Sequence, residues 1–136
     1  MSMVLLAAAF LLLLQGCHLE SNPVYRSAGI AAGAAVAGFS QRGTASYYGD
    51  GFHGKTTASG ETYDMYGLTC AHPSLPFGTV LSVLNLDNER EVTVRVNDRG
   101  PYVGGRIVDL SYGAAERLGM LDSGTASVLL TVVGGE

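Results

Sequence analysis

The sequence predicts a small, mainly β protein, a β-barrel with one or two short helices. Several short runs rich in Val, Leu, Ile and Thr are separated by turn-forming residues. No long amphipathic helix interrupts them, and one segment, which starts after Ser111, has a helical pattern. Short strands at this spacing are typical of small barrels. The chain has 136 residues, which is enough for one domain and the segments at its ends.

The N-terminal segment is typical of an exported lipoprotein. Val4 to Leu14 is an unbroken apolar run of 11 residues, which is far shorter than the ~20 that a membrane-spanning helix needs. This length fits the apolar region of a signal peptide. The segment Leu14-Gln15-Gly16-Cys17 then resembles the lipobox at which bacterial lipoproteins are cleaved and lipidated. We therefore expect a signal peptide over residues 1–16 and a lipid on Cys17; the alternative is an apolar helix packed in a core.

Residues 17–42 are expected to tether the lipid to the folded domain. Ser21-Asn22-Pro23 breaks regular structure, and Ala28–Phe39 is rich in Gly and Ala. A flexible arm and a weak interfacial helix are both compatible with this composition. His18 after the lipidated cysteine favours sorting to the outer membrane, with the domain facing the periplasm.

The folded domain is expected over residues 43–136. Its strands are predicted at Thr44–Tyr48, Thr79–Leu86, Glu91–Val96, Ile107–Leu110 and Ala126–Val133. Strict alternation after Glu91 places Val92, Val94 and Val96 on one face of their strand. Ser111 is predicted to cap a short helix that ends at Gly119.

Charge and cysteine content exclude several kinds of partner and site. The net charge is −4 and Lys and Arg form no cluster, so we expect no binding to nucleic acid. With Cys17 lipidated, Cys70 has no disulfide partner and is expected to be a small buried residue. His53 and His72 lack Cys or His partners at ligand spacing, so neither a metal site nor a cofactor is expected.

Three segments carry more polar residues than a scaffold requires. They are Tyr47–Asp64, Ala71–Gly78 and Val96–Ser111. Glycines in the first segment allow the backbone to approach a ligand closely. Aromatic rings can stack on the faces of sugars, while carboxylates bind hydroxyl groups or transfer protons. The composition therefore indicates a sugar-binding site.

Each candidate residue also has a plainer interpretation. Asp98 could cap the backbone of its loop, and Asp109 could lie at the start of a helix. His72 could be a satisfied core histidine, and Glu61 could be a solvated loop charge. Their joint occurrence in one short domain favours a functional site.

Residues 43–133 resemble the rare lipoprotein A family. The matching motifs, in order, are Ala45-Ser46-Tyr47-Tyr48-Gly49, Phe52-His53-Gly54-Lys55-Thr56, Ala58-Ser59-Gly60-Glu61, Ala71-His72, Leu75-Pro76, Asn97-Asp98-Arg99-Gly100-Pro101 and Arg106-Ile107-Val108-Asp109-Leu110-Ser111. The resemblance implies a six-stranded double-psi β-barrel, the fold of expansins. The C-terminal glycan-binding repeat domain of many members is not expected within this sequence.

The resemblance also implies an endolytic lytic transglycosylase that acts on peptidoglycan. Such an enzyme cuts the bond between N-acetylmuramic acid and N-acetylglucosamine and leaves a 1,6-anhydro product. Strands without stem peptides are its preferred substrate. The alternative is a non-catalytic, expansin-like lipoprotein that binds peptidoglycan without cutting it.

The site residues follow from the matching positions. Asp98 matches the presumed acid/base, while Glu61 and His72 match positions tied to activity. We expect Asp98 to act as acid and then as base, Glu61 to stabilise positive charge or bind sugar, and His72 to orient one of them. Five residues are expected to bind substrate: Tyr47, Tyr48, Asp64, Arg99 and Asp109.

Overall fold

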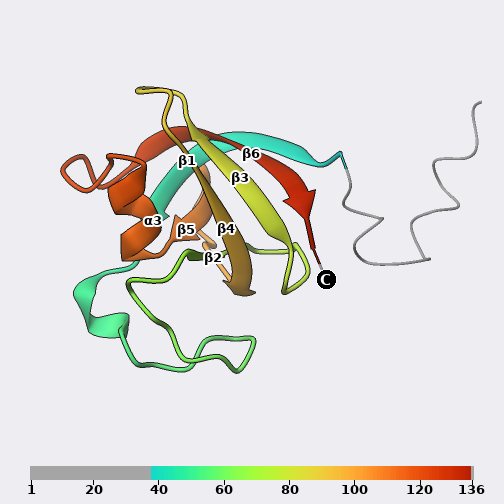
Figure 1. The fold of residues 1–136 in the computed structure, drawn as a ribbon, viewed down its shortest axis with the longest axis vertical. Helices are drawn as coiled ribbons and strands as arrows, with labels where there is room; N and C mark the ends of the chain where they lie inside the picture. The colour runs from blue at the N-terminus through green and yellow to red at the C-terminus, as the bar shows by residue number, and fades with distance from the viewer. Residues whose placement is uncertain (1–37, 136) are drawn as a thin grey trace, which may run out of the picture. The chain divides into compact units, whose positions relative to one another are not determined.

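Six strands form one closed barrel in the computed structural model, which describes residues 38–135. The strand order around the barrel is β1-β5-β2-β4-β3-β6, and Figure 1 labels the six strands. The strands are β1 (Ser40–Tyr47), β2 (Thr69–Ala71), β3 (Val80–Asn85), β4 (Glu91–Asp98), β5 (Arg106–Leu110) and β6 (Ala126–Gly134). One short α-helix, α3 (Tyr112–Arg117), and one 3-10 turn, η3 (Asp50–Phe52), complete the elements of this range. The expected mainly β, six-stranded barrel is confirmed.

Two of the six strand pairings are parallel. β1 pairs with β5 and β2 pairs with β4 in parallel, while the other four pairings are antiparallel. Parallel neighbours cannot be joined by a tight hairpin, so long connections link the strands. The longest described connection runs from β1 to β2 and lies below the barrel in Figure 1. This connection and the one between β4 and β5 supply most of the polar motifs.

The predicted strands are present, with two differences. β1 begins at Ser40 rather than near the expected domain boundary at residue 43, because its first residues already pair with β6. β2 was absent from the strands expected from alternation. A strand of three residues is too short to show a period of two. In addition, the consecutive residues Cys70 and Ala71 are both buried, so burial does not alternate along β2.

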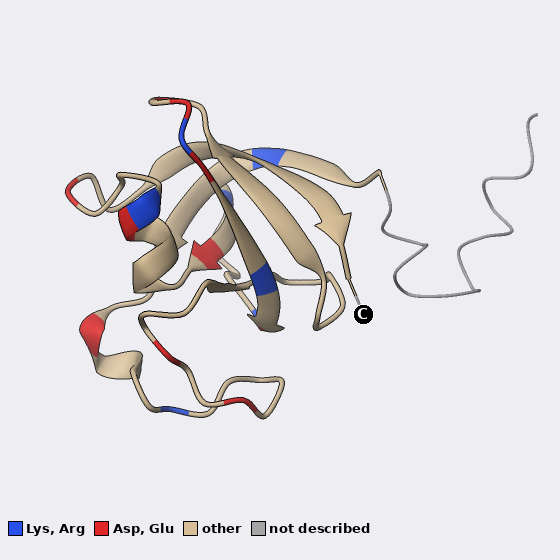
Figure 2. Cartoon of the chain, in the orientation of Figure 1, with Lys and Arg blue, Asp and Glu red and all other residues tan. Residues whose placement is uncertain are grey.

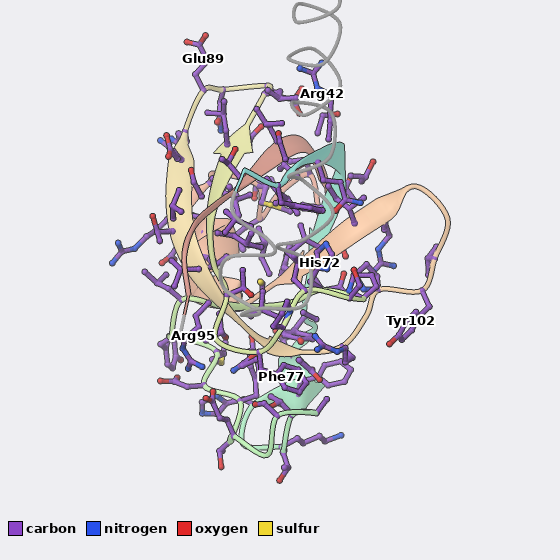
Figure 3. All side chains as sticks on the ribbon, turned by 90° about the vertical axis from the view of Figure 1, so that its right-hand side faces the viewer. Arg42, His72, Phe77, Glu89, Arg95 and Tyr102 are labelled. Atoms are coloured by element: carbon purple, nitrogen blue, oxygen red, sulfur yellow. The ribbon has the colours of Figure 1, made fainter. Side chains whose placement is uncertain are left out.

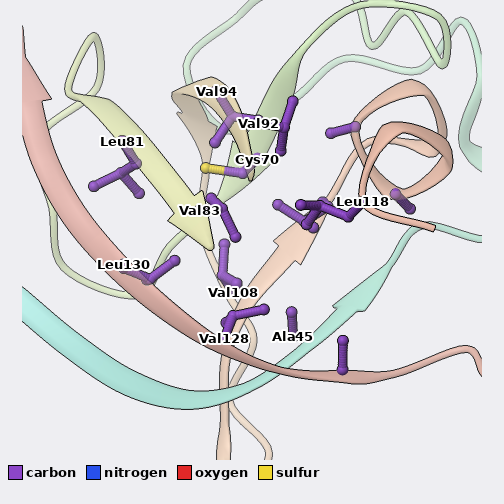
Figure 4. Close-up of a cluster of buried hydrophobic side chains, with 14 of the residues drawn as sticks. Ala45, Cys70, Leu81, Val83, Val92, Val94, Val108, Leu118, Val128 and Leu130 are labelled. Atoms are coloured by element: carbon purple, nitrogen blue, oxygen red, sulfur yellow. The ribbon is translucent and has the colours of Figure 1, made fainter. Parts of the chain in front are cut away.

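The barrel core contains the three valines of β4. Val92, Val94 and Val96 are buried and belong to one apolar cluster, part of which Figure 4 shows. Cys70 is completely buried in the same cluster, and this burial raises the pKa of its thiol. The expected role of Cys70 as a small buried residue is confirmed.

The helix begins and ends as the sequence predicts. The Ser111 side chain accepts a hydrogen bond from the Ala114 amide, which satisfies one of the free amides of the first turn. Gly119 follows the last helical turn with a φ of 69°, a conformation that glycine adopts without strain. Ala114, Ala115 and Leu118 face the core.

The expected signal peptide over residues 1–16, the lipidated Cys17 and most of the tether lie outside the described residues. Within residues 38–135, no helix has the length and apolarity that a membrane crossing requires. Basic and acidic positions are interspersed over the barrel and its loops, as Figure 2 shows.

Candidate functional site

A groove of about 410 Å³ lies between the end of β1 and the connection from β4 to β5. This volume falls in the range of small-molecule sites. Four aromatic residues, two aspartates, two arginines and two glycines are among the residues that surround it. The lining residues are Tyr47, Tyr48, Gly49, Phe52, Asp98, Arg99, Gly100, Pro101, Tyr102, Val103, Arg106 and Asp109.

Strand register brings the two carboxylates of the groove into one row. Ala71 on β2 pairs with Asp98 on β4 and with Asp109 on β5. Asp109 in turn pairs with Ser46 on β1. Neighbouring strands lie about 4.8 Å apart, so the Cα atoms of the two aspartates are about 10 Å apart. The row therefore crosses four adjacent strands of the barrel.

An irregularity in β4 decides where Asp98 points. Val96 pairs with Cys70 and Asp98 pairs with the next residue, Ala71, so Asn97 is an extra residue in the ladder. Regular alternation would have placed Asp98 on the core face together with Val96. The extra residue moves Asp98 to the groove, in line with the tendency of bulges to redirect side chains beside active sites.

The Asp98 carboxylate binds three donors. Its Oδ2 accepts a hydrogen bond of 2.7 Å from the Tyr48 hydroxyl. Its Oδ1 accepts hydrogen bonds of 2.9 Å from the backbone amides of Ala58 and Arg99. One oxygen is therefore fixed by the backbone, while the other faces a single hydroxyl group.

Tyr48 is held in place by other rings and keeps its proton. Burial raises the pKa of Tyr48, and the hydrogen bond to Asp98 and the charges of Asp98 and Asp109 raise it further. The Tyr48 ring centre lies 4.7 Å from that of Tyr63 and 5.6 Å from that of Phe52. The hydroxyl is therefore a fixed, protonated group beside Asp98.

Asp109 is neutralised within the groove. Its Oδ1 accepts hydrogen bonds from the Ser46 hydroxyl and from Arg106 Nη2, the latter at 2.6 Å. The bond to Arg106 is an ion pair in which the Asp109 side chain is mostly covered. Asp109 thus lies in the groove with its negative charge balanced by a neighbouring cation.

Arg99 is fixed by backbone carbonyls and by an aromatic ring. Its Nη1 donates to the Leu75 carbonyl at 2.7 Å and to the His72 carbonyl at 3.3 Å. Its guanidinium carbon lies 3.9 Å from the centre of the Phe77 ring. The side chain is therefore held in one orientation at the edge of the groove.

Glu61 lies outside the groove lining and forms a forked ion pair. Arg95 donates to its two carboxylate oxygens at 2.7 and 2.9 Å, and Asn97 Nδ2 donates at 3.1 Å. These hydrogen bonds, that of Arg95 first, lower the pKa of Glu61. They attach the loop of Glu61 to β4, and the same loop supplies the Ala58 amide to Asp98. In this position Glu61 holds the loop whose amide donates to Asp98 and lies apart from the groove.

His72 is buried, with 2% of its surface exposed, and also lies outside the groove lining. Its Nδ1 accepts hydrogen bonds from the amides of Ser74 and Leu75, and its Nε2 pairs with Gln41 Oε1 at 2.9 Å. Burial and the charge of Arg99 lower the pKa of His72 to about 4. A neutral His72 thus stabilises the turn whose carbonyls hold Arg99.

The groove brings together five of the eight predicted site residues: Tyr47, Tyr48, Asp98, Arg99 and Asp109. Tyr47 also donates its hydroxyl to the Leu121 carbonyl at 2.9 Å. Asp64 lies apart from the groove and accepts a hydrogen bond from the Tyr66 amide in its own turn. Across residues 38–135, no three His, Cys, Asp or Glu residues are grouped as a metal site would need.

Among the lining residues to which the sequence assigned no role are three with large side chains that suit a sugar site: Phe52, Tyr102 and Arg106. Tyr102 is 78% exposed and extends from the loop before β5, as Figure 3 shows. An aromatic residue between glycines in a loop is a signal that could have identified it. Phe52 and Arg106 lie within the motifs of the resemblance, but their contact with the groove depends on the fold.

Comparisons with known proteins identify relatives of this chain. The family described as lytic transglycolase matches residues 40–130. "Endolytic peptidoglycan transglycosylase RlpA" of Campylobacter jejuni is 61% identical over 92 residues, which are 68% of this chain and 34% of that protein. The protein of the same name from Neisseria meningitidis is 47% identical over 113 residues, 82% of this chain and 47% of that protein. The chain thus spans less than half of either relative.

Solved structures support the fold. A Streptomyces papain inhibitor has a TM-score of 0.59 at 25% identity and covers 71% of this chain and 96% of its own. The expansin of Clavibacter michiganensis has a TM-score of 0.56 at 24% identity and covers 70% of this chain and 50% of its own. Both are double-psi β-barrel proteins, and their different names show that this fold alone fixes no activity. The family match and the identities to the curated relatives show that the chain belongs to the lytic transglycolase family.

Proposed function

We propose that this protein is an endolytic lytic transglycosylase that cuts peptidoglycan glycan strands between N-acetylmuramic acid and N-acetylglucosamine. The observation that carries the proposal is Asp98, a carboxyl group turned into an open groove beside the protonated Tyr48 hydroxyl. The names of the curated relatives describe the same reaction class. The groove volume and its aromatic lining are suited to sugar rings.

The proposed reaction needs one carboxyl group in two roles. Asp98 first gives its proton to the glycosidic oxygen, so the bond to C1 of the muramic sugar breaks and positive charge develops at C1. The C6 hydroxyl of the same sugar then attacks C1 and returns its proton to Asp98. The products are a free sugar end and a 1,6-anhydro end, and no water is consumed.

The two oxygens of Asp98 are suited to different tasks. Oδ1 is occupied by two backbone amides, which orient the carboxyl group. Oδ2 contacts the Tyr48 hydroxyl, which can donate to the carboxylate and can accept from the carboxylic acid. We therefore assign the transferred proton to Oδ2.

The remaining predicted residues support this centre in different ways. Asp109 lies in the groove, where its ion pair with Arg106 fixes both side chains beside the substrate. Glu61 positions the loop that carries the Ala58 amide, and His72 positions Arg99 through the turn over residues 72–75. Both act on the reaction through other residues.

Two finer parts of the proposal concern substrate and location. Strands without stem peptides are the proposed preferred substrate, on the basis of the family resemblance. The lipobox that ends at Cys17 supports a lipid anchor, and His18 supports an outer-membrane location facing the periplasm.

The proposal is tested with peptide-free glycan strands and mass spectrometry of the products. The wild-type protein should release fragments with 1,6-anhydro ends. Asp98→Asn should lower turnover by about 10²–10⁴-fold, the usual contribution of general acid/base catalysis, while the protein stays folded. The exposed Asp122→Asn is the matched control and should keep full turnover.

Two outcomes would contradict the proposal in different ways. Wild-type protein that binds strands without releasing anhydro products would indicate the expansin-like binding function. Full turnover by Asp98→Asn would show that another group delivers the proton.

A further inference from the structure

The two arginines of the groove differ in how their charges are balanced. Arg106 forms an ion pair with Asp109 at 2.6 Å. The guanidinium of Arg99, by contrast, forms no ion pair with a carboxylate among residues 38–135. Its contacts are two neutral carbonyls and the Phe77 ring. Arg99 therefore lines the groove with a guanidinium that no carboxylate of residues 38–135 pairs with directly.

The orientation of Arg99 is set before any ligand binds. Both carbonyl bonds use Nη1, and the flat guanidinium lies over Phe77. In the described part of the chain, its Nε and Nη2 have no hydrogen-bond partner. These two nitrogens are adjacent donors of the kind that binds a carboxylate with two parallel hydrogen bonds. Because the side chain is already fixed, little rotational freedom is lost on binding.

The neighbours of Arg99 reinforce this arrangement. His72 uses Nδ1 to hold the amides of Ser74 and Leu75, and the Leu75 carbonyl then holds Arg99. His72 and Phe77 are both labelled in Figure 3, and Phe77 lies at the lower end of the barrel. The site is thus supported by buried structure rather than by a solvated loop.

We propose that Arg99 binds the free lactyl carboxylate of a muramic sugar in the groove. This inference rests on the proposed function and deepens it. The stem peptide is joined to the glycan through an amide on this same carboxyl group, so the group is anionic only where the peptide is absent. A guanidinium gains a charge-assisted bond from the free acid and none from the neutral amide. Arg99 is therefore the residue that selects strands without stem peptides.

The position of Arg99 fits the proposed reaction. Arg99 directly follows Asp98, and both line the groove. The lactyl ether is on C3 of the muramic ring and the cleaved bond is on C1, so both groups belong to one sugar. Binding of the carboxylate by Arg99 would hold that ring with its C1 side toward Asp98.

The experiment changes the ligand first and leaves the protein intact. Peptide-free strands are compared with the same strands after coupling of their carboxyl groups to methylamine, which removes the charge. Wild-type protein should bind the free-acid strands about 10- to 100-fold more tightly, the range expected for a hydrogen bond to a charged group. The difference should shrink as salt is raised, because the groove is open to solvent.

The protein variants then assign the effect to Arg99. Arg99→Gln should weaken binding of the free-acid strands and leave binding of the methylamide strands unchanged. Arg117→Gln, an exposed arginine on α3, should keep the full difference. Equal affinity of wild-type protein for the two kinds of strand would overturn the inference without any variant. Arg99→Gln that weakens both equally would also overturn it.

Binding and product release separate the two proposals. If wild-type protein discriminates between the strands but releases no anhydro product, the charge site stands and the proposed activity fails. If it releases anhydro product from both kinds of strand with equal affinity and rate, the activity stands and the role of Arg99 fails.

Discussion

The Tyr48 hydroxyl donates a hydrogen bond to Asp98 Oδ2, the oxygen to which the transferred proton is assigned. Tyr48→Phe removes the hydrogen bond to Asp98 Oδ2 and retains the ring that packs against Tyr63 and Phe52. We expect turnover on peptide-free strands to fall by about 10-fold or more, the effect of losing one hydrogen bond to a charged group. The exposed Tyr66→Phe is the control and should retain its rate. An unchanged rate in Tyr48→Phe would mean that Oδ2 does not need the hydroxyl.

His72 should make the stability of the barrel depend on pH. Its pKa is lowered from the ordinary 6.5 to about 4, so the unfolded chain binds the proton more tightly than the folded one. The stabilisation is complete above pH 6.5 and is lost as the pH falls toward 4, by about 3 kcal/mol at most. Unfolding by urea at several pH values measures it.

His72→Gln provides the comparison, because glutamine keeps hydrogen-bonding groups and does not titrate in this range. The carboxylates of the protein titrate in both proteins, and Glu61, whose pKa is lowered, also loses stability on acidification. The difference between the two proteins in how the free energy of unfolding changes with pH therefore reports the contribution of His72. If the free energy of unfolding fell equally in both proteins from pH 6.5 to 4, His72 would not be buried in its neutral form.

The identity of the site residues could be predicted from motifs, but their orientation could not. Asp98 lies at a position that alternation assigns to the core face, and the extra residue Asn97 moves it to the groove. Glu61 was expected to stabilise charge or bind sugar and His72 to orient a carboxylate, yet Glu61 pairs with Arg95 and His72 bonds to Gln41 and to the amides of its own turn. Which partner captures a charged or polar side chain depends on contacts between segments far apart in the sequence.

At the scale of elements, the register of β4 decides which of its side chains pack in the barrel core. Val94→Asp would place an unpaired charge among the buried valines of the core and should unfold the barrel, since such burial costs several kcal/mol. Glu91→Gln on the exposed face should change stability little, because it affects one surface contact with Ser82. Thermal unfolding followed by circular dichroism compares them. Similar midpoints would contradict the register of the strand.

The strands with clear alternation or a long apolar run could be predicted, and β2 could not. Val92, Val94 and Val96 in β4 show a period of two because one face is buried and the other is exposed. β2 has three residues and lies between β4, a parallel neighbour, and β5, an antiparallel neighbour. A strand of this length is too short to show alternation. Its presence follows from the family resemblance and not from local pattern.

At the scale of the whole molecule, the N-terminal segment makes a prediction that the barrel does not address. Cys17→Ala should leave an uncleaved precursor without lipid, because the Cys17 thiol is the group that the proposed lipobox would offer for modification. Mass spectrometry of the protein from membrane fractions should show the diacylglycerol mass on the wild type and not on the variant. Barrel folding should be equal in both, which serves as the control. Wild-type protein with an unmodified N-terminus would contradict the prediction.

The row formed by Asp98, Ala71, Asp109 and Ser46 links the geometry of the site to the unfolding of the barrel. Its four members come from β4, β2, β5 and β1, so no single strand contains the row. Many enzymes hold their catalytic groups on loops that loosen before the scaffold does. Here the row lies on adjacent strands of a closed barrel, so its two aspartates keep their spacing as long as the barrel remains closed and lose it when the barrel opens.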